Sequence, residues 1–165
     1  MSIVVNALVT VGTVAAMEVV AVLVHRYVMH GPGWGWHRSH HEPHDGKFEV
    51  NDLYGLIFAT IAALLFIFGP GPASPVYWVA VGMLAYGLLY FVVHDGLVHQ
   101  RWPFRSKPRH PYLKRLVQAH RLHHAVEGRD GCVSFGFLYA PPVRRLRDRL
   151  RAQGGRVGPA EDTSR

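Results

Sequence analysis

Ten of the twelve histidines fall into four short motifs of two repeated kinds. HxxxxH motifs place two histidines five residues apart, and HxxHH motifs place three within about one helical turn. In the order HxxxxH, HxxHH, HxxxxH, HxxHH, the ten are His25, His30, His37, His40, His41, His94, His99, His120, His123 and His124. Imidazole is the commonest metal ligand, and so many clustered imidazoles repel one another when protonated. The pattern therefore predicts neutral, metal-bound histidines.

The spacing within the motifs predicts two metal ions. Each residue of an α-helix turns by about 100°, so the three histidines of an HxxHH motif lie within about a third of the circumference. We expect each triplet to form one ligand face. Histidines five residues apart diverge by roughly 140° on a straight helix, so each HxxxxH pair needs a bend or must face different metals.

Histidine ligands alone suit zinc, copper, iron or nickel. Ten imidazoles shared between two ions give about five each, more than the usual four ligands of a structural zinc site. No Glu-x-x-His pair occurs, which excludes the carboxylate-rich di-iron site of soluble four-helix bundles. A histidine-rich di-iron centre that activates O2 at a membrane surface fits best, and its substrate is then a lipid.

Three apolar runs could place these motifs at a membrane. Residues 3–24 contain one charge, Glu18, and residues 53–69 and 76–93 contain none. A membrane-spanning helix needs about 20 such residues, with about 17 as a lower limit. The first run lacks the preceding basic residues of a cleaved signal peptide, and the Gly- and Pro-rich residues 69–75 predict a hairpin between the other two. We expect an all-α integral membrane protein with about three transmembrane helices, or a fourth, partial one.

The basic residues predict the orientation of these helices. All eighteen Lys and Arg follow the first or the third apolar run, and three crossings place both segments on one side. The positive-inside rule makes that side cytoplasmic, so we expect a cytoplasmic helical cap that carries a histidine-rich di-metal site. Attraction to anionic lipids accounts for the formal net charge of +7, and no nucleic-acid partner is expected.

A few further residues are candidates to support the site. Glu18 is an ionisable residue within a span, and we expect it to orient an imidazole from another helix; a protonated carboxyl bonded to a neighbouring span is the alternative. Asn51 and Asp95 are also candidates to orient an imidazole, with loop capping the simpler role for Asn51. The apolar segment 133–142 either packs, lies in the membrane interface or lines the entrance for an apolar substrate through Phe135, Phe137 and Tyr139.

The C-terminal part contains a basic helix, residues 144–151, which we expect to rest against the membrane surface. The residues after it have few apolar side chains and are expected to be disordered. Residues 1–152 are therefore one domain and residues 153–165 a tail.

The order of the four motifs resembles the fatty-acid hydroxylase and sterol desaturase superfamily of integral-membrane di-iron enzymes. Three stretches are similar to bacterial non-haem β-carotene hydroxylases: His94-Asp-Gly-Leu-Val-His99-Gln-Arg-Trp-Pro-Phe104, Gln118-Ala-His120-Arg-Leu-His123-His124 and Cys132-Val-Ser-Phe-Gly-Phe-Leu-Tyr-Ala-Pro141. The resemblance runs from about residue 18 to residue 142, and none of the four motifs departs from the family pattern.

This resemblance implies a β-carotene 3-hydroxylase of the bacterial inner membrane, with its active site on the cytoplasmic side. It would hydroxylate carbon 3 of β-ionone rings, turning β-carotene into cryptoxanthin and zeaxanthin, and by extension canthaxanthin into astaxanthin. Two Fe(II) ions held by the ten histidines, O2 as co-substrate and reduced ferredoxin recharged from NAD(P)H are implied. The residues Arg101, Arg105, Lys107 and Arg109 could dock an acidic ferredoxin, and lipid headgroups explain them equally well.

Other functions are compatible with parts of the pattern. Another membrane di-iron oxygenase or desaturase, or a carotenoid ketolase, would use the same motifs. A b-type haem protein needs only two to four histidines and leaves the HxxHH triplets unexplained. A metal transporter should carry its ligands near the middle of its spans rather than at their ends.

Overall fold

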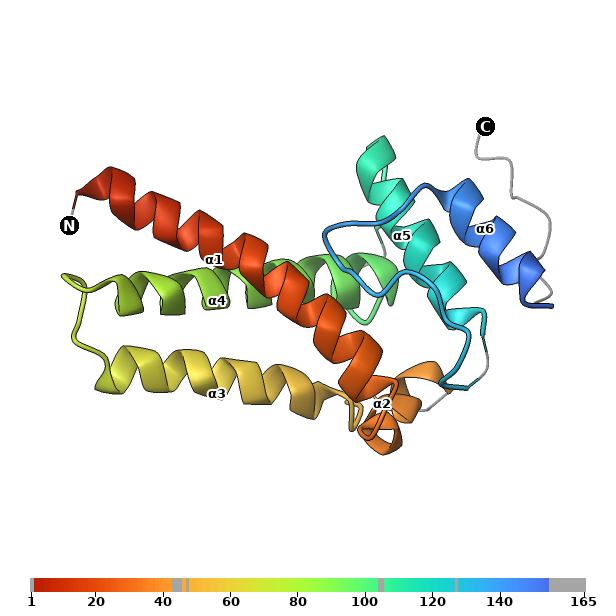
Figure 1. Cartoon of the computed structure of the whole chain (residues 1–165), viewed down its shortest axis with the longest axis horizontal. Coiled ribbons are helices and arrows are strands. Elements are labelled where there is room, and N and C mark those ends of the chain that lie inside the picture. Colours follow the sequence, from red (N-terminus) through yellow and green to blue (C-terminus); the bar gives the residue numbers. More distant parts are fainter. Residues whose placement is uncertain (1, 43–45, 47, 104–105, 127, 155–165) are drawn as a thin grey trace.

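The structure is a computed structural model that describes residues 2–42, 46, 48–103, 106–126 and 128–154. In these ranges every regular element is helical, as the sequence predicts. The long helices α1 (Ile3–Leu23), α3 (Asp52–Phe68) and α4 (Pro75–Tyr90) extend along the molecule. The short helices α2 (Trp34–His41), α5 (Pro111–His124) and α6 (Val143–Ala152) gather at the end away from the N-terminus (Figure 1).

Two of the long helices continue into π-helical segments. α1 runs directly into η1 (Val24–Met29), and α4 runs into η2 (Phe91–Val98). The resulting helices, Ile3–Met29 and Pro75–Val98, are long and apolar enough to cross a membrane, whereas α3 has 17 residues and is shorter. The structure thus contains two candidate membrane helices, and the count of three crossings stays a prediction.

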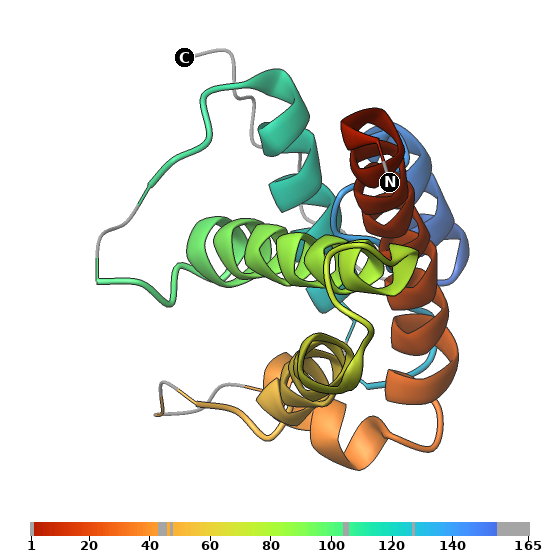
Figure 2. The same cartoon turned by 90° about the vertical axis from the view of Figure 1, so that its left-hand side faces the viewer.

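Helix α4 is the central one of the three long helices. It packs against both α1 and α3, as the end-on view in Figure 2 shows. At Gly82 a Cβ atom would lie 2.5 Å from Cβ of Thr13 and 2.8 Å from the carbonyl oxygen of Thr10. A small residue is therefore required where α4 crosses α1, as is common between membrane helices.

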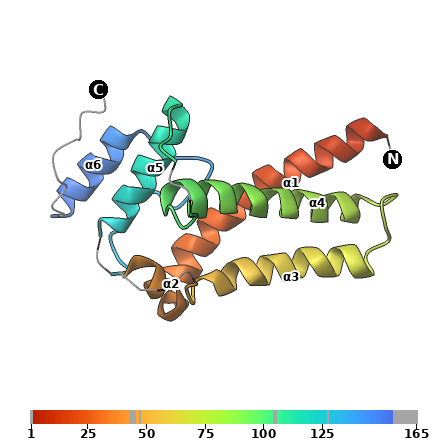
Figure 3. The same ribbon diagram turned by 180° about the vertical axis from the view of Figure 1, so that it is seen from behind.

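The predicted hairpin joins α3 to α4. The Oγ atom of Ser74 accepts a hydrogen bond from the Val76 N–H at 3.2 Å, and Pro75 takes the first helical position. Both features favour a helix start at this point. The hairpin lies at the end of the molecule opposite α2 and α5 (Figure 3).

The short helices α5 and α6 contribute most of a small apolar core, which Val93 of η2 and the segment between the two helices complete. Leu146 and Leu150 of α6 are fully buried and pack with Leu116, Ala119 and Leu122 of α5. The apolar face of α6 is therefore used within the protein, and only its exposed arginines are available to lipid headgroups. Helix α6 ends at Ala152, and the division into a domain and a tail stays a prediction; from position 155 onward the tail lies outside the described residues.

Candidate metal centre

All ten predicted ligands come together where α1 and α4 end and α2 and α5 meet them. They form two adjoining clusters, in each of which the ligand nitrogens lie within 4.8 Å of one another. The five-histidine cluster contains His25, His30, His37, His41 and His123, and the four-histidine cluster contains His40, His94, His99 and His120. His124, the tenth, lies at the boundary. Its Nε2 is 2.9 Å from Nε2 of His120, and its ring stacks on that of His41 at 4.3 Å.

The HxxHH triplets do not form single ligand faces, so this expectation is wrong. In α2, His37 and His41 belong to the five-histidine cluster and His40 to the four-histidine cluster. In α5 the division is reversed, because His123 joins the five-histidine cluster and His120 the other. Positions i+3 and i+4 differ by about 100° around a helix, which is enough to direct adjacent residues to opposite sides of a boundary. Each cluster could hold one ion, and the number of ions stays a prediction.

The HxxxxH pairs each stay within one cluster because the helix is of the π type there. The His30 N–H donates to the His25 carbonyl at 3.0 Å, and the His99 N–H donates to the His94 carbonyl at 2.9 Å. These i→i+5 bonds widen the turn, so residues five apart lie over one another. The distortion that the spacing required is thus a π-turn in both repeats, a feature frequent at functional sites.

Hydrogen bonds at Nδ1 fix the direction of six imidazoles. Three donate to backbone carbonyls and three to side-chain oxygens: His25 to Phe135 (2.9 Å), His30 to Arg129 (2.7 Å), His123 to Val133 (2.9 Å), and, at 2.7 Å each, His37 to Asn51, His40 to Glu49 and His94 to Asp95. Because these oxygens only accept, the proton of each neutral imidazole is on Nδ1 and the lone pair of Nε2 points into the cluster.

The inward Nε2 atoms have the spacing of ligands around one ion. Nε2 of His25 lies 3.1 Å from Nε2 of His37, and Nε2 of His94 lies 3.1 Å from Nε2 of His40. Two imidazole nitrogens bound to one ion at about 2.0–2.1 Å are about 3 Å apart at ordinary coordination angles. Nitrogen lone pairs that face each other at this distance repel, and a shared cation removes the repulsion. The donor set therefore fits a metal ion in each cluster.

Burial keeps these imidazoles neutral. Loss of solvent is the main cause that lowers the pKa of His37 from 6.5 to about 4, that of His41 to about 2 and that of His124 to about 3. Neighbouring imidazoles lower the last two pKa values further. The pKa values of His40 and His120 are also lowered well below 6.5 by burial and by adjacent histidines. Neutral imidazole is the form that binds metal.

Of the three predicted orienting residues, Asn51 and Asp95 lie against imidazoles, but Glu18 does not. Oε1 of Glu18 accepts hydrogen bonds from the backbone N–H groups of three consecutive residues, at 3.0, 3.0 and 2.9 Å, and Oε2 accepts one from Tyr86 at 2.8 Å. The three donors are Phe137, Leu138 and Tyr139. The expectation that Glu18 orients an imidazole is therefore wrong, because its carboxyl group binds this loop. Its hydrogen bond with Tyr86 of α4 is the bond to a neighbouring span that the alternative expected.

Glu49 and Arg101 have roles that the sequence did not predict. Glu49 accepts the His40 hydrogen bond and its side chain is 4% exposed. Arg101 donates two hydrogen bonds to Asp52, at 2.9 and 2.7 Å, and its Nη1 lies 3.6 Å from the Asp95 carboxylate. Arg101 is thus part of the site's surroundings rather than a free docking residue, and Arg105 lies outside the described residues. Irregular backbone precedes both residues, so no helical spacing relates them to the histidines.

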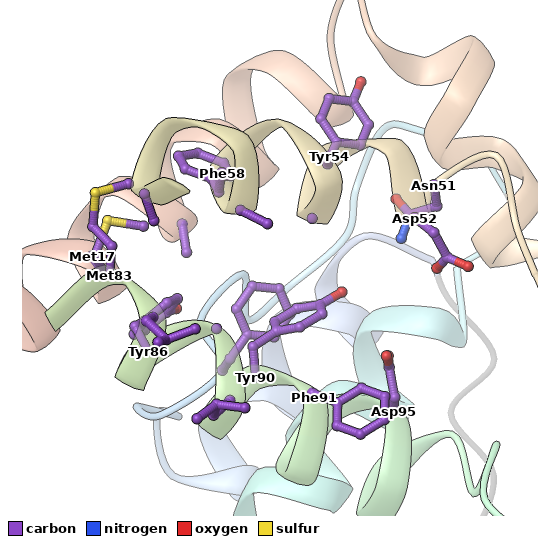
Figure 4. A pocket seen from close by; sticks show the side chains of 18 of the residues that line it. Met17, Asn51, Asp52, Tyr54, Phe58, Met83, Tyr86, Tyr90, Phe91 and Asp95 are labelled. Atoms are coloured by element: carbon purple, nitrogen blue, oxygen red, sulfur yellow. The ribbon is translucent and has the colours of Figure 1, made fainter. Parts of the chain in front are cut away.

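A cavity of about 700 Å³ lies between α1, α3 and α4, and Tyr90 and Asp95, which both contact His94 of the four-histidine cluster, are among its lining residues (Figure 4). Met17, Phe58 and Met83 line its apolar part. Asn51, Asp52, Asp95 and Arg101 line its polar end. The cavity is open to a long, predominantly apolar ligand, which is the kind of molecule that a lipid bilayer contains.

Two aromatic rings separate the cavity from the histidines. Tyr90 stacks on His94 with ring centroids 4.4 Å apart, and Phe137 contacts the same imidazole edge-on at 5.1 Å. Phe137 therefore lines the cavity as predicted. The other two predicted lining residues do not: Phe135 packs against the five-histidine cluster, and Tyr139 is 65% exposed. The loop curls around Glu18, so its aromatic residues point in different directions.

Apolar helices that end in two adjoining clusters of neutral imidazoles define an all-helical protein suited to bind metal ions at a membrane surface. The chain belongs to the fatty acid hydroxylase family, whose model matches residues 10–141. No solved structure matches it.

Several relatives named beta-carotene hydroxylase are similar over nearly the whole chain. The protein from Pantoea ananas is 61% identical over 158 residues, which are 95% of this chain and 90% of the relative. The protein from a Paracoccus species is 63% identical over 150 residues, 90% of this chain and 93% of the relative. A chloroplastic beta-carotene hydroxylase of Capsicum annuum is 37% identical over 137 residues, 79% of this chain and 42% of the relative.

Proposed function

We propose that this protein is a membrane-bound carotenoid hydroxylase that converts β-carotene through cryptoxanthin into zeaxanthin. Each turnover replaces the hydrogen at carbon 3 of a β-ionone ring with a hydroxyl group, while the second oxygen atom of O2 becomes water with two electrons and two protons. The observation that carries the proposal is the pair of all-histidine clusters at the end of an apolar cavity, in a chain about 60% identical to beta-carotene hydroxylases.

The ten histidines would hold two Fe(II) ions, one in each cluster, with His124 at the boundary between them. Bound iron supplies the activation of O2 that a C–H bond of this kind requires. The chain itself keeps the imidazoles neutral, holds their protons on Nδ1 and directs Nε2 inward. Tyr90 and Phe137 line the cavity and contact His94, so they would border the β-ionone ring where it approaches the metal centre and help to exclude water there.

The cavity accounts for an apolar substrate. Its walls come from α1, α3 and α4, so a carotenoid could enter from the bilayer between these helices with its ring toward the polar end. We propose that α3 completes a three-helix membrane domain with α1 and α4. The histidine clusters and the described basic residues of α2, α5 and α6 then lie on the cytoplasmic side of the inner membrane.

The electron donor is proposed to be a reduced ferredoxin, recharged from NAD(P)H. Lys107 and Arg109 are exposed near the start of α5 and could receive an acidic partner. Anionic lipid headgroups compete for the same residues. Replacing both with glutamine should slow ferredoxin-driven turnover and leave membrane insertion unchanged.

The alternatives fit the geometry less well. Axial imidazoles of a haem lie on opposite faces of a porphyrin, whereas Nε2 atoms about 3 Å apart leave no room for one. A transporter is disfavoured because the clusters lie at the ends of the candidate membrane helices rather than at their centres. Ketolation and desaturation use the same kind of centre and must be separated by product analysis.

The test is expression in cells that accumulate β-carotene, with pigment analysis after growth under 18O2. We expect cryptoxanthin and zeaxanthin that carry one 18O atom per hydroxyl group, and no such products from the His123→Ala variant. Ketocarotenoids or newly desaturated pigments as the products, or label that comes from water, would contradict the proposal.

A further inference from the structure

The two clusters differ in what lies behind their imidazoles. In the five-histidine cluster, His25, His30 and His123 donate from Nδ1 to backbone carbonyls, and His37 donates to the amide oxygen of Asn51. All four acceptors are neutral. Near this cluster, the Asp130 carboxylate is 87% exposed and paired with Arg129, so water and salt screen its charge.

In the four-histidine cluster, two acceptors are carboxylates. His40 donates to Glu49 and His94 donates to Asp95, at 2.7 Å in both cases. The side chains of Glu49 and Asp95 are 4% and 14% exposed, so their charges act with little screening.

Arg101 joins these two carboxylates to a third. Its guanidinium group pairs with Asp52 and lies 3.6 Å from Asp95 and 4.0 Å from Glu49. Buried carboxylates thus lie directly behind two ligands of the four-histidine cluster, where their negative charge favours a divalent cation. The Nδ1 acceptors described for the five-histidine cluster include no carboxylate.

We infer that the two metal sites are inequivalent and that the four-histidine cluster binds its divalent ion more tightly than the five-histidine cluster. A carboxylate that accepts the Nδ1 proton makes the imidazole a more basic ligand than a carbonyl does, and loss of such a partner typically weakens metal binding about 10–100-fold. Two carboxylate-backed ligands therefore outweigh the one additional imidazole of the five-histidine cluster. The inference rests on the proposal that both clusters hold metal.

The experiment is an equilibrium titration of the chelator-stripped, detergent-solubilised protein with Co(II), against a competing chelator. Cobalt absorption bands report on each site without any turnover. We expect two classes of site that differ by at least about tenfold in affinity. His99→Ala should abolish the tight class, and His30→Ala should abolish the weak class.

Two substitutions test the cause. Glu49→Gln preserves the shape of the acceptor and should weaken the tight class about 10–100-fold while it leaves the weak class unchanged. Asn51→Asp places a carboxylate behind His37 and should tighten the weak class. Glu42→Gln removes the same charge from a side chain that is 60% exposed and should change neither class.

Two sites of equal affinity would overturn the inference, as would a Glu49→Gln effect on the weak class alone. Circular dichroism of each stripped variant separates misfolding from lost affinity, and Asn51→Asp tests for a gain that misfolding cannot produce. The proposed function fails independently: unequal cobalt sites in a protein that makes no hydroxylated carotenoid would retain the inference and reject the hydroxylase.

Discussion

His40 and His41 are adjacent in the chain, yet their imidazoles belong to different clusters. Nε2 of His40 lies 3.1 Å from Nε2 of His94, whereas Nε2 of His41 lies 3.2 Å from Nε2 of His37. Helix α2 thus runs along the boundary between the clusters, and α5 does the same from the other side through His120 and His123. Each HxxHH motif ties the two clusters together, so the sites cannot move apart independently.

Single substitutions of these neighbours should remove different ions. We expect His40→Ala and His41→Ala each to retain about one iron per chain and to lose hydroxylation by more than about 100-fold, because the proposed reaction needs both sites. Metal analysis and pigment analysis of the purified variants provide the measurement.

His110→Asn is the matched control for these variants. His110 lies outside both clusters and caps α5 by accepting a hydrogen bond from the Tyr112 N–H at 3.3 Å, a role that asparagine also fills. It should retain two ions. Two ions in His40→Ala or in His41→Ala would show that the replaced imidazole is not a required ligand.

Glu18 should prove important through the loop that it holds. Glu18→Ala leaves the amides of residues 137–139 without their acceptor, at a cost of about 1–3 kcal/mol in the free energy of unfolding, because the loop is only partly shielded from water. The same loop provides the carbonyls that orient His25 and His123, so hydroxylation should fall about 10–100-fold.

Thermal denaturation and turnover measure these two effects. Tyr86→Phe removes only the hydrogen bond to Oε2 of Glu18 and should cost about 1 kcal/mol with little loss of turnover. Wild-type turnover and melting temperature in Glu18→Ala would reject the role of the carboxylate in holding the loop.

The sequence predicted which histidines make up the site, but it did not predict how they are divided between the two clusters. The spacing within each motif depends only on local helix geometry, so the sequence could identify the ten histidines as ligands that come together in one site. The division of His37, His40 and His41 between two clusters depends on where α2 lies relative to α5. Sequence spacing carries no information about that packing.

The errors at Glu18 and Glu49 have the same physical origin. Glu18 binds a loop about 120 residues further along the chain, and Glu49 reaches His40 from irregular backbone. The π-turn at His25 and His30, by contrast, could have been predicted from the sequence. Two ligands five apart in both repeats required a local distortion, and a π-turn is one that keeps both on one face.

Acid should destabilise the metal-free protein. The pKa values of His37, His41 and His124 are lowered from 6.5 to about 4, 2 and 3 by burial, so between pH 6.5 and about 4 the unfolded chain binds more protons than the folded one. The stability contributed by neutral histidines is complete above pH 6.5 and is lost as pH falls below it.

We therefore expect the melting temperature of the stripped protein to decrease from pH 7 to pH 5. Iron-loaded protein should resist this change because bound metal competes with protons for the imidazoles. A constant melting temperature of the stripped protein across this range would show that these imidazoles do not titrate on unfolding.

The cavity should set substrate affinity without affecting the metal sites. Ala62 of α3 is buried and lines the cavity, so Ala62→Phe would fill space that the carotenoid needs. We expect KM for β-carotene to rise about tenfold, the equivalent of about 1.4 kcal/mol of lost binding, with unchanged iron content. Turnover in nanodiscs at several carotenoid concentrations measures this change in KM.

Ile61→Phe is the matched control. Ile61 is 42% exposed and is not among the residues that line the cavity, so this variant should leave KM unchanged. An equal rise of KM in both variants would place the substrate elsewhere.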